Sequence, residues 1–315
     1  MKKVIKIIVS AVLMLALVAS LAATVYADEE EVYEDAVSKM YAGDCKEAEE
    51  MFEQLGDYKD SAANAAYLEE RETNPGDLCN VNERLARDTV SEGGTLKECI
   101  SWVYYVPNTV DKNTKCILYY PGGCGEAGLF TQAVRDYVAQ YNPNAIIVAM
   151  RTSGYGDAKT LSAHVEKSYQ LLETICRENG IVIHDLVLAG SSNGGYTGLK
   201  AISDLFLKHH IAAKALLVYD MGVSFTCAHL LPNADECKII NDIGTKMYFF
   251  EQTSLKRNDT QLEFLMNMGF PDDYVMVYCT HDEHNRITWD GFSTGTLSWA
   301  LGEQDSIPSD HYTFG

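Results

Sequence analysis

The sequence predicts an α/β fold, in which a mostly parallel central sheet carries helices on both faces and a small helical hairpin precedes it. Short apolar segments alternate with amphipathic segments from about residue 80 to residue 303. The short segments are apolar at nearly every position, which is typical of parallel strands buried on both faces. The 315 residues are enough for one large domain and a small appendage.

The strands and helices of the main domain, residues 75–315, are expected in a regular alternation. Each expected helix has apolar residues at helical spacing, and turn residues such as Pro107-Asn108 separate the segments. The expected strands are 99–106, 115–120, 145–150, 185–189, 215–219, 246–250 and 273–279, and the expected helices are 130–140, 161–178, 197–208, 262–268 and 296–301.

Residues 1–27 have the features of a secretory signal peptide. Three lysines precede an apolar run over residues 7–25, and Val25-Tyr26-Ala27 is similar to a small-residue cleavage site. The run is also long enough for a retained membrane anchor, but the acidic residues that begin at Asp28 favour cleavage after Ala27. We therefore expect a secreted or cell-surface protein without stable membrane insertion after cleavage.

Residues 28–74 predict a helical hairpin that is separate from the main domain. They contain no proline, Gly56-Asp57 ends one helix, and residues 58–62 open another. The pattern resembles the helix-turn-helix unit of tetratricopeptide-like repeats. One such unit does not bury its own apolar face, so residues 28–72 should pack on the main domain or on a protein partner. A helical spacer without a binding role is the alternative.

The charge of the chain argues against nucleic acid as a partner. The sequence has 45 acidic and 25 basic residues, and removing the three leader lysines leaves 22 basic residues and a net charge of −23. Such a surface repels phosphate backbones and anionic membranes. The charge says nothing about catalysis.

All nine cysteines lie after residue 27. An exported protein can form disulfides, and the odd number leaves at least one thiol unpaired within a single chain. Cys116 and Cys279 lie in apolar strand-like runs and are interpreted as core residues. Cys227 and Cys237 flank a short loop and are the pair that the sequence favours. No Cys-x-x-Cys pattern indicates a zinc site, and we expect no metal.

A Gly-x-Ser-x-Gly turn is the strongest indication of chemistry. The apolar run 185–189 stops at Gly190-Ser191-Ser192-Asn193-Gly194, and a helix-forming segment follows. Glycines on both sides of Ser192 permit a tight strand-turn-helix connection that exposes the serine at the edge of the sheet. Ser192 is therefore a candidate nucleophile.

The same motif occurs a second time around Ser293, in Gly291-Phe292-Ser293-Thr294-Gly295. That copy follows a polar stretch instead of a buried strand. Only 20 residues come after it, too few to supply a downstream acid and base. The context therefore favours Ser192.

Together these features resemble the α/β-hydrolase family over about residues 95–303, and the closest likeness is to secreted acetyl-ester, feruloyl-ester and polyhydroxyalkanoate-depolymerase esterases. The resemblance implies a serine hydrolase that cleaves a small-molecule or polymer-borne carboxylic ester through an acyl-enzyme intermediate, without a cofactor. A serine peptidase of the same fold is one alternative. A catalytically inactive hydrolase fold that serves as a surface binding module is another.

The family resemblance implies that a histidine after the last strand acts as the base. His281 and His284 both follow the run 273–279. His284 is preferred because Trp289 follows it at the spacing seen in related esterases. His281 is then a surface or supporting residue.

The resemblance also implies a carboxylate that orients this histidine. The usual aspartate position, a few residues after the run 246–250, holds Thr253 and Ser254 instead. Asp259 ranks first, although it is equally suited to cap a helix. Glu251, directly after the run, ranks second, and Asp220, after the preceding strand, ranks third.

Backbone amides are expected to hold the oxyanion of the reaction. Asn193, directly after the nucleophile, would supply one. The glycine-rich loop 120–125 resembles the oxyanion loop of the family and would supply another from Gly123 or Cys124. Substrate contacts are expected from the loops 151–157 and 221–232, with Tyr155, Phe225 and Trp289 as aromatic candidates.

Overall fold

A computed structural model describes the chain in segments. The described residues are 29–37, 39–40, 45–59, 61–73, 87–90, 93–98, 102–122, 127–150, 157–221, 229–252, 274–279, 296–300, 303 and 311–313. The leader 1–27 and the expected helix 262–268 lie outside them. The chain divides into two compact units, Met1–Thr73 and Asn74–Gly315.

The second unit is built on a ten-stranded sheet with the order β1-β2-β3-β5-β4-β6-β7-β8-β9-β10. Six strands from β5 to β9 run parallel, and antiparallel pairs close both ends of the sheet. This strand order confirms the expected α/β-hydrolase fold. The strands are β1 Arg87–Val90, β2 Gly94–Glu98, β3 Trp102–Pro107, β4 Lys115–Tyr120, β5 Ala145–Met150, β6 Leu186–Ser191, β7 Ala215–Tyr219, β8 Lys246–Gln252, β9 Tyr274–Cys279 and β10 His311–Thr313.

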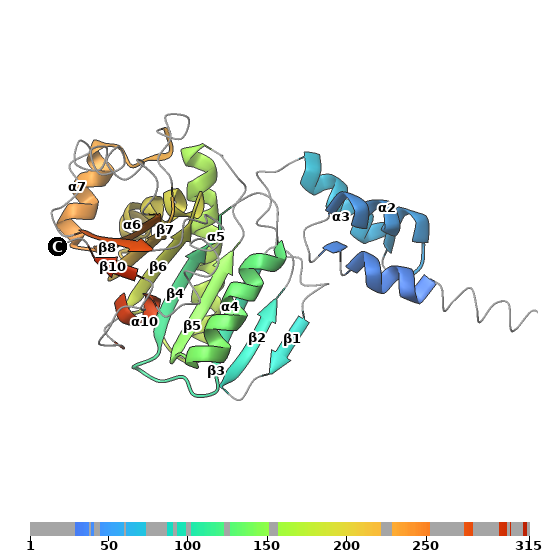
Figure 1. The fold of residues 1–315 in the computed structure, drawn as a ribbon, viewed down its shortest axis with the longest axis horizontal. Coiled ribbons are helices and arrows are strands. Elements are labelled where there is room, and N and C mark those ends of the chain that lie inside the picture. Colours follow the sequence, from blue (N-terminus) through green and yellow to red (C-terminus); the bar gives the residue numbers. More distant parts are fainter. Residues whose placement is uncertain are drawn as a thin grey trace, which may run out of the picture. The chain divides into compact units, whose positions relative to one another are not determined.

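Helices cover both faces of this sheet (Figure 1). The helices of the unit are α4 Ala127–Tyr141, α5 Ala158–Glu178, α6 Gly194–His209, α7 Ala234–Ile243 and α10 Thr296–Ala300. Every residue of β5, β6 and β7 is buried, because a sheet with two covered faces leaves no strand position in water. Leu118 and Leu188 pack on the side of α5 and α6, whereas Tyr219 reaches Thr296 of α10 on the opposite face.

Four elements of the unit were absent from the sequence-based expectation or only partly included in it. The edge strands β1 and β10 are short, and β2 Gly94–Glu98 alternates between buried and half-buried residues as a strand near the edge does. The helix α7 begins at a capping box, in which the side chains of Asn233 and Glu236 satisfy each other's backbone N–H groups.

The first unit is helical, as expected for this part of the chain. Residues 29–37 and 39–40 are helical, α2 spans Cys45–Leu55 and α3 spans Ser61–Thr73. Tyr33 packs edge-on against Phe52 with 5.8 Å between ring centroids, and Met40, Phe52 and Leu68 are buried. Among the described residues, no helix has both the length and the apolar character needed to cross a membrane.

Candidate active site

Ser192 lies on a sharp turn between β6 and α6. The strand ends at Ser191 and the helix begins at Gly194, so only two residues connect them. Ser192 has a φ of 49°, in the left-handed region that non-glycine residues seldom adopt. Its N–H donates to the Tyr219 carbonyl at 2.8 Å, and its carbonyl accepts from the Gly195 N–H at 3.0 Å. These hydrogen bonds hold the strained residue in place.

The two glycines of the motif are required by close backbone packing. A Cβ atom at Gly190 would lie 2.4 Å from the Gly194 carbonyl oxygen, and a Cβ atom at Gly194 would lie 1.7 Å from the Tyr120 carbonyl oxygen. Both contacts are with backbone, which cannot rotate away. The turn therefore permits only glycine at these positions.

The loop after β4 touches this turn at Gly122. A Cβ atom at Gly122 would lie 2.4 Å from the Ser191 carbonyl oxygen and 2.5 Å from Ser192 Cβ. The beginning of the glycine-rich loop is thus packed against Ser192. Gly123 and Cys124, the expected oxyanion residues of that loop, lie outside the described residues.

Ser192 and two buried acidic residues, Asp220 and Glu251, form a row along the carboxyl edge of the sheet. Ser191 pairs with Tyr219, and Tyr219 pairs with Phe250. Ser192, Asp220 and Glu251 each follow one of these residues. Asp220 has no exposed surface, and Glu251 is 1% exposed.

Asp220 also has an unusual backbone. Its φ is 46°, and its N–H donates to the Phe250 carbonyl at 2.7 Å. Aspartate tolerates the left-handed region better than most residues. This hydrogen bond links the ends of β7 and β8, as the hydrogen bond from Ser192 to Tyr219 links the ends of β6 and β7. Asp259, the acid that the sequence ranked first, lies outside the described residues.

A layer of buried hydroxyl groups supports the turn from the face of α4 and α10. The hydroxyl groups of Tyr119 and Ser191 are 2.8 Å apart, directly before Ser192 in the chain. Tyr219 and Thr296 form a second pair at 2.9 Å. Burial raises the pKa of Tyr119, against a smaller lowering by its hydrogen bond to Ser191, so the phenol stays neutral.

Asn193 lies at the N-terminus of α6. It is 9% exposed and has helical backbone angles, with φ −59° and ψ −27°. The N-terminus of a helix carries partial positive charge from its unpaired N–H groups. An anion next to Ser192 would therefore lie in a favourable field.

Several expected site residues lie outside the part of the chain that the structure describes. The strand β9 ends at Cys279 on the same edge as β6, because β6 to β9 run parallel. The residues that follow it are not described. The site residues concerned are His281, His284 and Asp259, the aromatic candidates Tyr155, Phe225 and Trp289, and the second motif serine, Ser293.

The described residues contain no cluster of three or more histidine, cysteine or acidic side chains that could hold a metal ion.

The pairing of Tyr119 with Ser191 was not predicted from the sequence. The two hydroxyl groups come from strands 72 positions apart in the chain. No local pattern connects them, because the contact depends on the pairing of β4 with β6.

Comparison with known proteins finds a fold likeness without a close relative. No family model matches the chain, and no curated protein matches it. Solved structures with a similar fold include esterases. A cold-adapted esterase from an Arctic intertidal metagenomic library has a TM-score of 0.45 and 14% identity over 68% of this chain and 91% of that chain.

Two further similar structures give comparable values. A thermostable esterase from Pseudomonas putida has a TM-score of 0.42 and 14% identity over 68% of this chain and 80% of that chain. A lipase/esterase from Lactobacillus plantarum has a TM-score of 0.42 and 12% identity over 69% of this chain and 97% of that chain.

Proposed function

We propose that this protein is a secreted serine hydrolase that cleaves a carboxylic ester through an acyl-enzyme intermediate. The observation that carries the proposal is the backbone of Ser192. A non-glycine residue with a φ of 49° stands between a buried strand and a helix N-terminus, with Gly122 packed against it. Such strain persists only where the surrounding structure enforces it, and it is frequent at reactive positions.

In the proposed reaction, Ser192 Oγ attacks the ester carbonyl carbon while His284 takes its proton. The negative charge on the carbonyl oxygen is held by the Asn193 N–H and by an N–H of Gly123 or Cys124. His284 then returns the proton to the leaving alcohol as the acyl-enzyme forms. His284 then takes a proton from water, which attacks the acyl carbonyl carbon, and passes this proton to Ser192 Oγ as the carboxylic acid leaves. No cofactor takes part.

The acid that orients His284 is one of Asp259, Glu251 and Asp220. The sequence favours Asp259. Glu251 and Asp220 are supported because both are buried and lie in the same row as Ser192 at the carboxyl edge of the sheet. The variants Asp259→Asn, Glu251→Gln and Asp220→Asn separate them. The true acid variant should lose about 10⁴-fold in kcat with little change in melting temperature. If all three variants keep wild-type kcat, the proposed triad is wrong.

A fluorophosphonate probe tests the nucleophile. The wild-type protein should be labelled covalently, the Ser192→Ala variant should not, and the Ser293→Ala variant should be labelled like the wild type. Ser293 is the matched control because it belongs to the other Gly-x-Ser-x-Gly motif. Equal labelling of Ser192→Ala and wild type would reject Ser192 as the nucleophile.

Two measurements separate the proposal from its alternatives. Faster turnover of short-chain nitrophenyl esters than of aminoacyl amides supports an esterase, and the reverse supports a peptidase. A wild-type protein that resists the probe but retains a protein through residues 28–72 would be a binding module. N-terminal sequencing of the exported protein tests secretion, with Asp28 as the expected first residue.

A further inference from the structure

Two buried cysteines of the main domain lie in contact across the sheet-helix interface. Cys116 is the second residue of β4, and Cys176 lies near the end of α5. Their Sγ atoms are 3.7 Å apart, and both side chains are essentially without exposed surface. Local sequence does not indicate this contact, since Cys116 by itself has the features of a core residue.

We propose that Cys116 and Cys176 form a disulfide bond that fastens α5 to the central strand β4. A disulfide has an S–S length of about 2.05 Å, so the two sulfur atoms at 3.7 Å must approach by roughly 1.6 Å. Small rotations of two cysteine side chains supply a movement of that size. The proposal does not depend on the hydrolase function.

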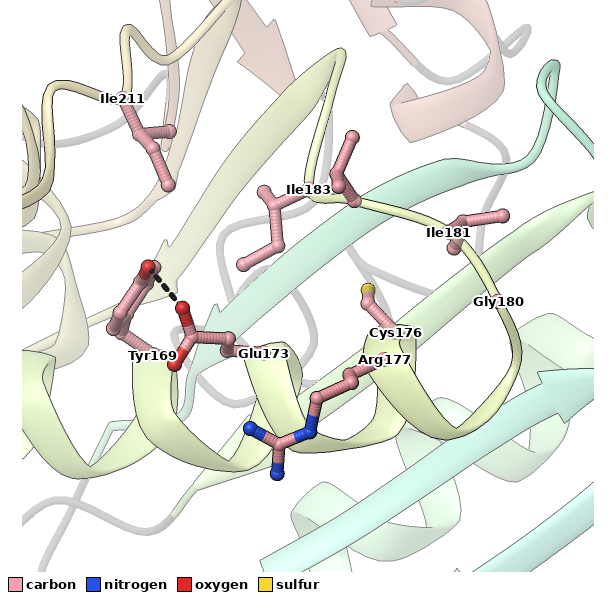
Figure 2. Close-up of a pocket in the computed structure, with 9 residues that line it drawn as sticks. Tyr169, Glu173, Cys176, Arg177, Gly180, Ile181, Ile183 and Ile211 are labelled. Carbon is pink, nitrogen blue, oxygen red and sulfur yellow. Dashed lines mark hydrogen bonds between the residues drawn. The ribbon is translucent and has the colours of Figure 1, made fainter.

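Both sulfurs are buried, so a disulfide reagent reaches the pair through local opening, and one of the two cysteines borders a groove. Cys176 lines an open groove of about 530 Å³, together with Tyr169, Arg177 and the segment from Gly180 to Ile183. Figure 2 shows the Cys176 side chain rising from α5 towards Ile181 and Ile183. Cys116, in contrast, lies in a strand that pairs with β5 on one side and β6 on the other. Cys176 is thus the entry point.

The hydrogen bond between the two thiols decides which of them holds the proton in the reduced pair. The hydrogen bond with Cys176 lowers the pKa of Cys116, and the same hydrogen bond, followed by burial, raises the pKa of Cys176. The proton therefore rests on Cys176, and Cys116 has the larger thiolate fraction. Thiolates are the nucleophiles of disulfide exchange.

The bond forms by exchange with an external disulfide such as oxidised glutathione. Cys176 Sγ attacks one sulfur of that disulfide and forms a mixed disulfide, while its proton passes to the departing glutathione thiolate. Cys116 Sγ then attacks Cys176 Sγ and expels the second glutathione as thiolate, which takes up a proton from water. The two protein thiols are oxidised, and one glutathione disulfide is reduced to two thiols.

The other buried thiol of the described residues provides a matched control. Cys237 is buried at 2% exposure, and its Sγ donates to the Pro232 carbonyl at 3.6 Å. Cys227, which the sequence favours as the disulfide partner of Cys237, lies outside the described residues. Replacing Cys237 with alanine removes a buried thiol of the same domain and leaves the proposed pair untouched.

The test is peptide mapping of the folded full chain after equilibration in an oxidised and reduced glutathione buffer. Free thiols are blocked with N-ethylmaleimide in denaturant, so that buried thiols are also reached, and the protein is digested with trypsin and chymotrypsin without reduction. Chymotrypsin is needed because Cys124 shares a tryptic peptide with Cys116, while Leu118, Tyr119 and Tyr120 separate them. We expect a linked peptide that contains Cys116 and Cys176, present in Cys237→Ala and absent in Cys176→Ala.

A second readout measures the effect of the bond on stability. The oxidised protein should melt roughly 5–10 °C above the reduced protein, because the bond closes a loop of about 60 residues in the unfolded chain. Cys176→Ala should show no such difference. Alkylation of both thiols in the oxidised protein, or a link from either cysteine to a different one, would overturn the proposal. The wild-type map decides the matter even if Cys176→Ala does not fold.

Discussion

Ser192 and Asp220 share a strained backbone at the ends of neighbouring strands. Their φ angles of 49° and 46° lie in the left-handed region, which costs a non-glycine residue on the order of 1–3 kcal/mol. Each N–H donates to a carbonyl of the adjacent strand. The sheet thus compensates for the strain at the positions where the proposed reaction takes place.

At Gly194, replacement by alanine should disrupt the turn. The new Cβ would lie 1.7 Å from the Tyr120 carbonyl oxygen, so the backbone of β4 or α6 must move. We expect a loss of about 3 kcal/mol or more in the free energy of unfolding and loss of probe labelling. Urea unfolding and fluorophosphonate labelling measure the two effects.

Gly198→Ala is the matched control for Gly194→Ala in the same helix. Its Cβ would lie 2.7 Å from Leu216 Cδ1, the end of a flexible side chain. We expect a cost of about 1 kcal/mol with labelling retained. Equal destabilisation by the two variants would show that backbone contact at Gly194 is not the deciding feature.

For the buried hydroxyl pair below the turn, a double-mutant cycle gives a clear expectation. Tyr119→Phe and Ser191→Ala each remove this buried hydrogen bond, which should cost about 0.5–1.5 kcal/mol. The double variant should cost less than the sum of the two, because both changes remove the same hydrogen bond. Strict additivity of the unfolding free energies would contradict a direct interaction.

At the level of elements, α6 and α7 are joined by a partly buried group of charges. Lys200 Nζ lies 2.6 Å from Asp204 Oδ1 and 2.5 Å from Glu236 Oε1. The Asp204 side chain is 6% exposed. Burial alone would raise the pKa of Asp204, but hydrogen bonds from Lys200 and Ser162 and the nearby lysine charges lower it on balance.

This lowered pKa predicts a pH dependence of stability. The unfolded chain has an aspartate pKa near 3.9, so the contribution of Asp204 is fully present above about pH 4. It is lost as the pH falls below that value and passes through the lower pKa of the folded state. Unfolding free energies between about pH 2 and pH 6 should fall more steeply for wild type than for Asp204→Asn. Parallel curves would show that Asp204 is not stabilised as its contacts indicate.

How well local sequence predicts an element depends on where the element lies in the sheet. The strands β4, β5 and β7 were predicted with the bounds found, since central parallel strands are apolar throughout. The helix α7 was not predicted, although Asn233 and Glu236 are the capping-box residues that mark its start. The short edge strands β1 and β10 gain their regularity from pairing with a neighbour, and no pattern in their own residues indicates it.

For the whole molecule, the chain divides into two units, and the boundary between them in the sequence follows Thr73. The first unit has its own buried apolar residues, among them Met40, Phe52 and Leu68. Each unit therefore has the core that independent folding requires. The expectation that residues 28–72 contact a protein partner is separate from catalysis.

A chain of residues 74–315 should accordingly keep its reactivity without the helical unit. We expect fluorophosphonate labelling at the rate of the full chain and a single cooperative melting transition in calorimetry. Loss of labelling in a truncated protein that still melts cooperatively would mean that the helical unit contributes to the site. The full-length Ser192→Ala variant provides the background for both proteins.

The location of the proposed nucleophile follows from local sequence, because a tight turn between an apolar strand and a helix requires glycines at fixed positions around Ser192. The parallel arrangement of the central strands follows as well, since buried parallel strands have continuous apolar runs. The contacts of Tyr119 with Ser191 and of Cys116 with Cys176, and the row that joins Ser192, Asp220 and Glu251, come only with the tertiary structure. Each joins segments that are distant in the chain. Strand register and helix packing bring these segments together, and the sequence around a single residue indicates neither.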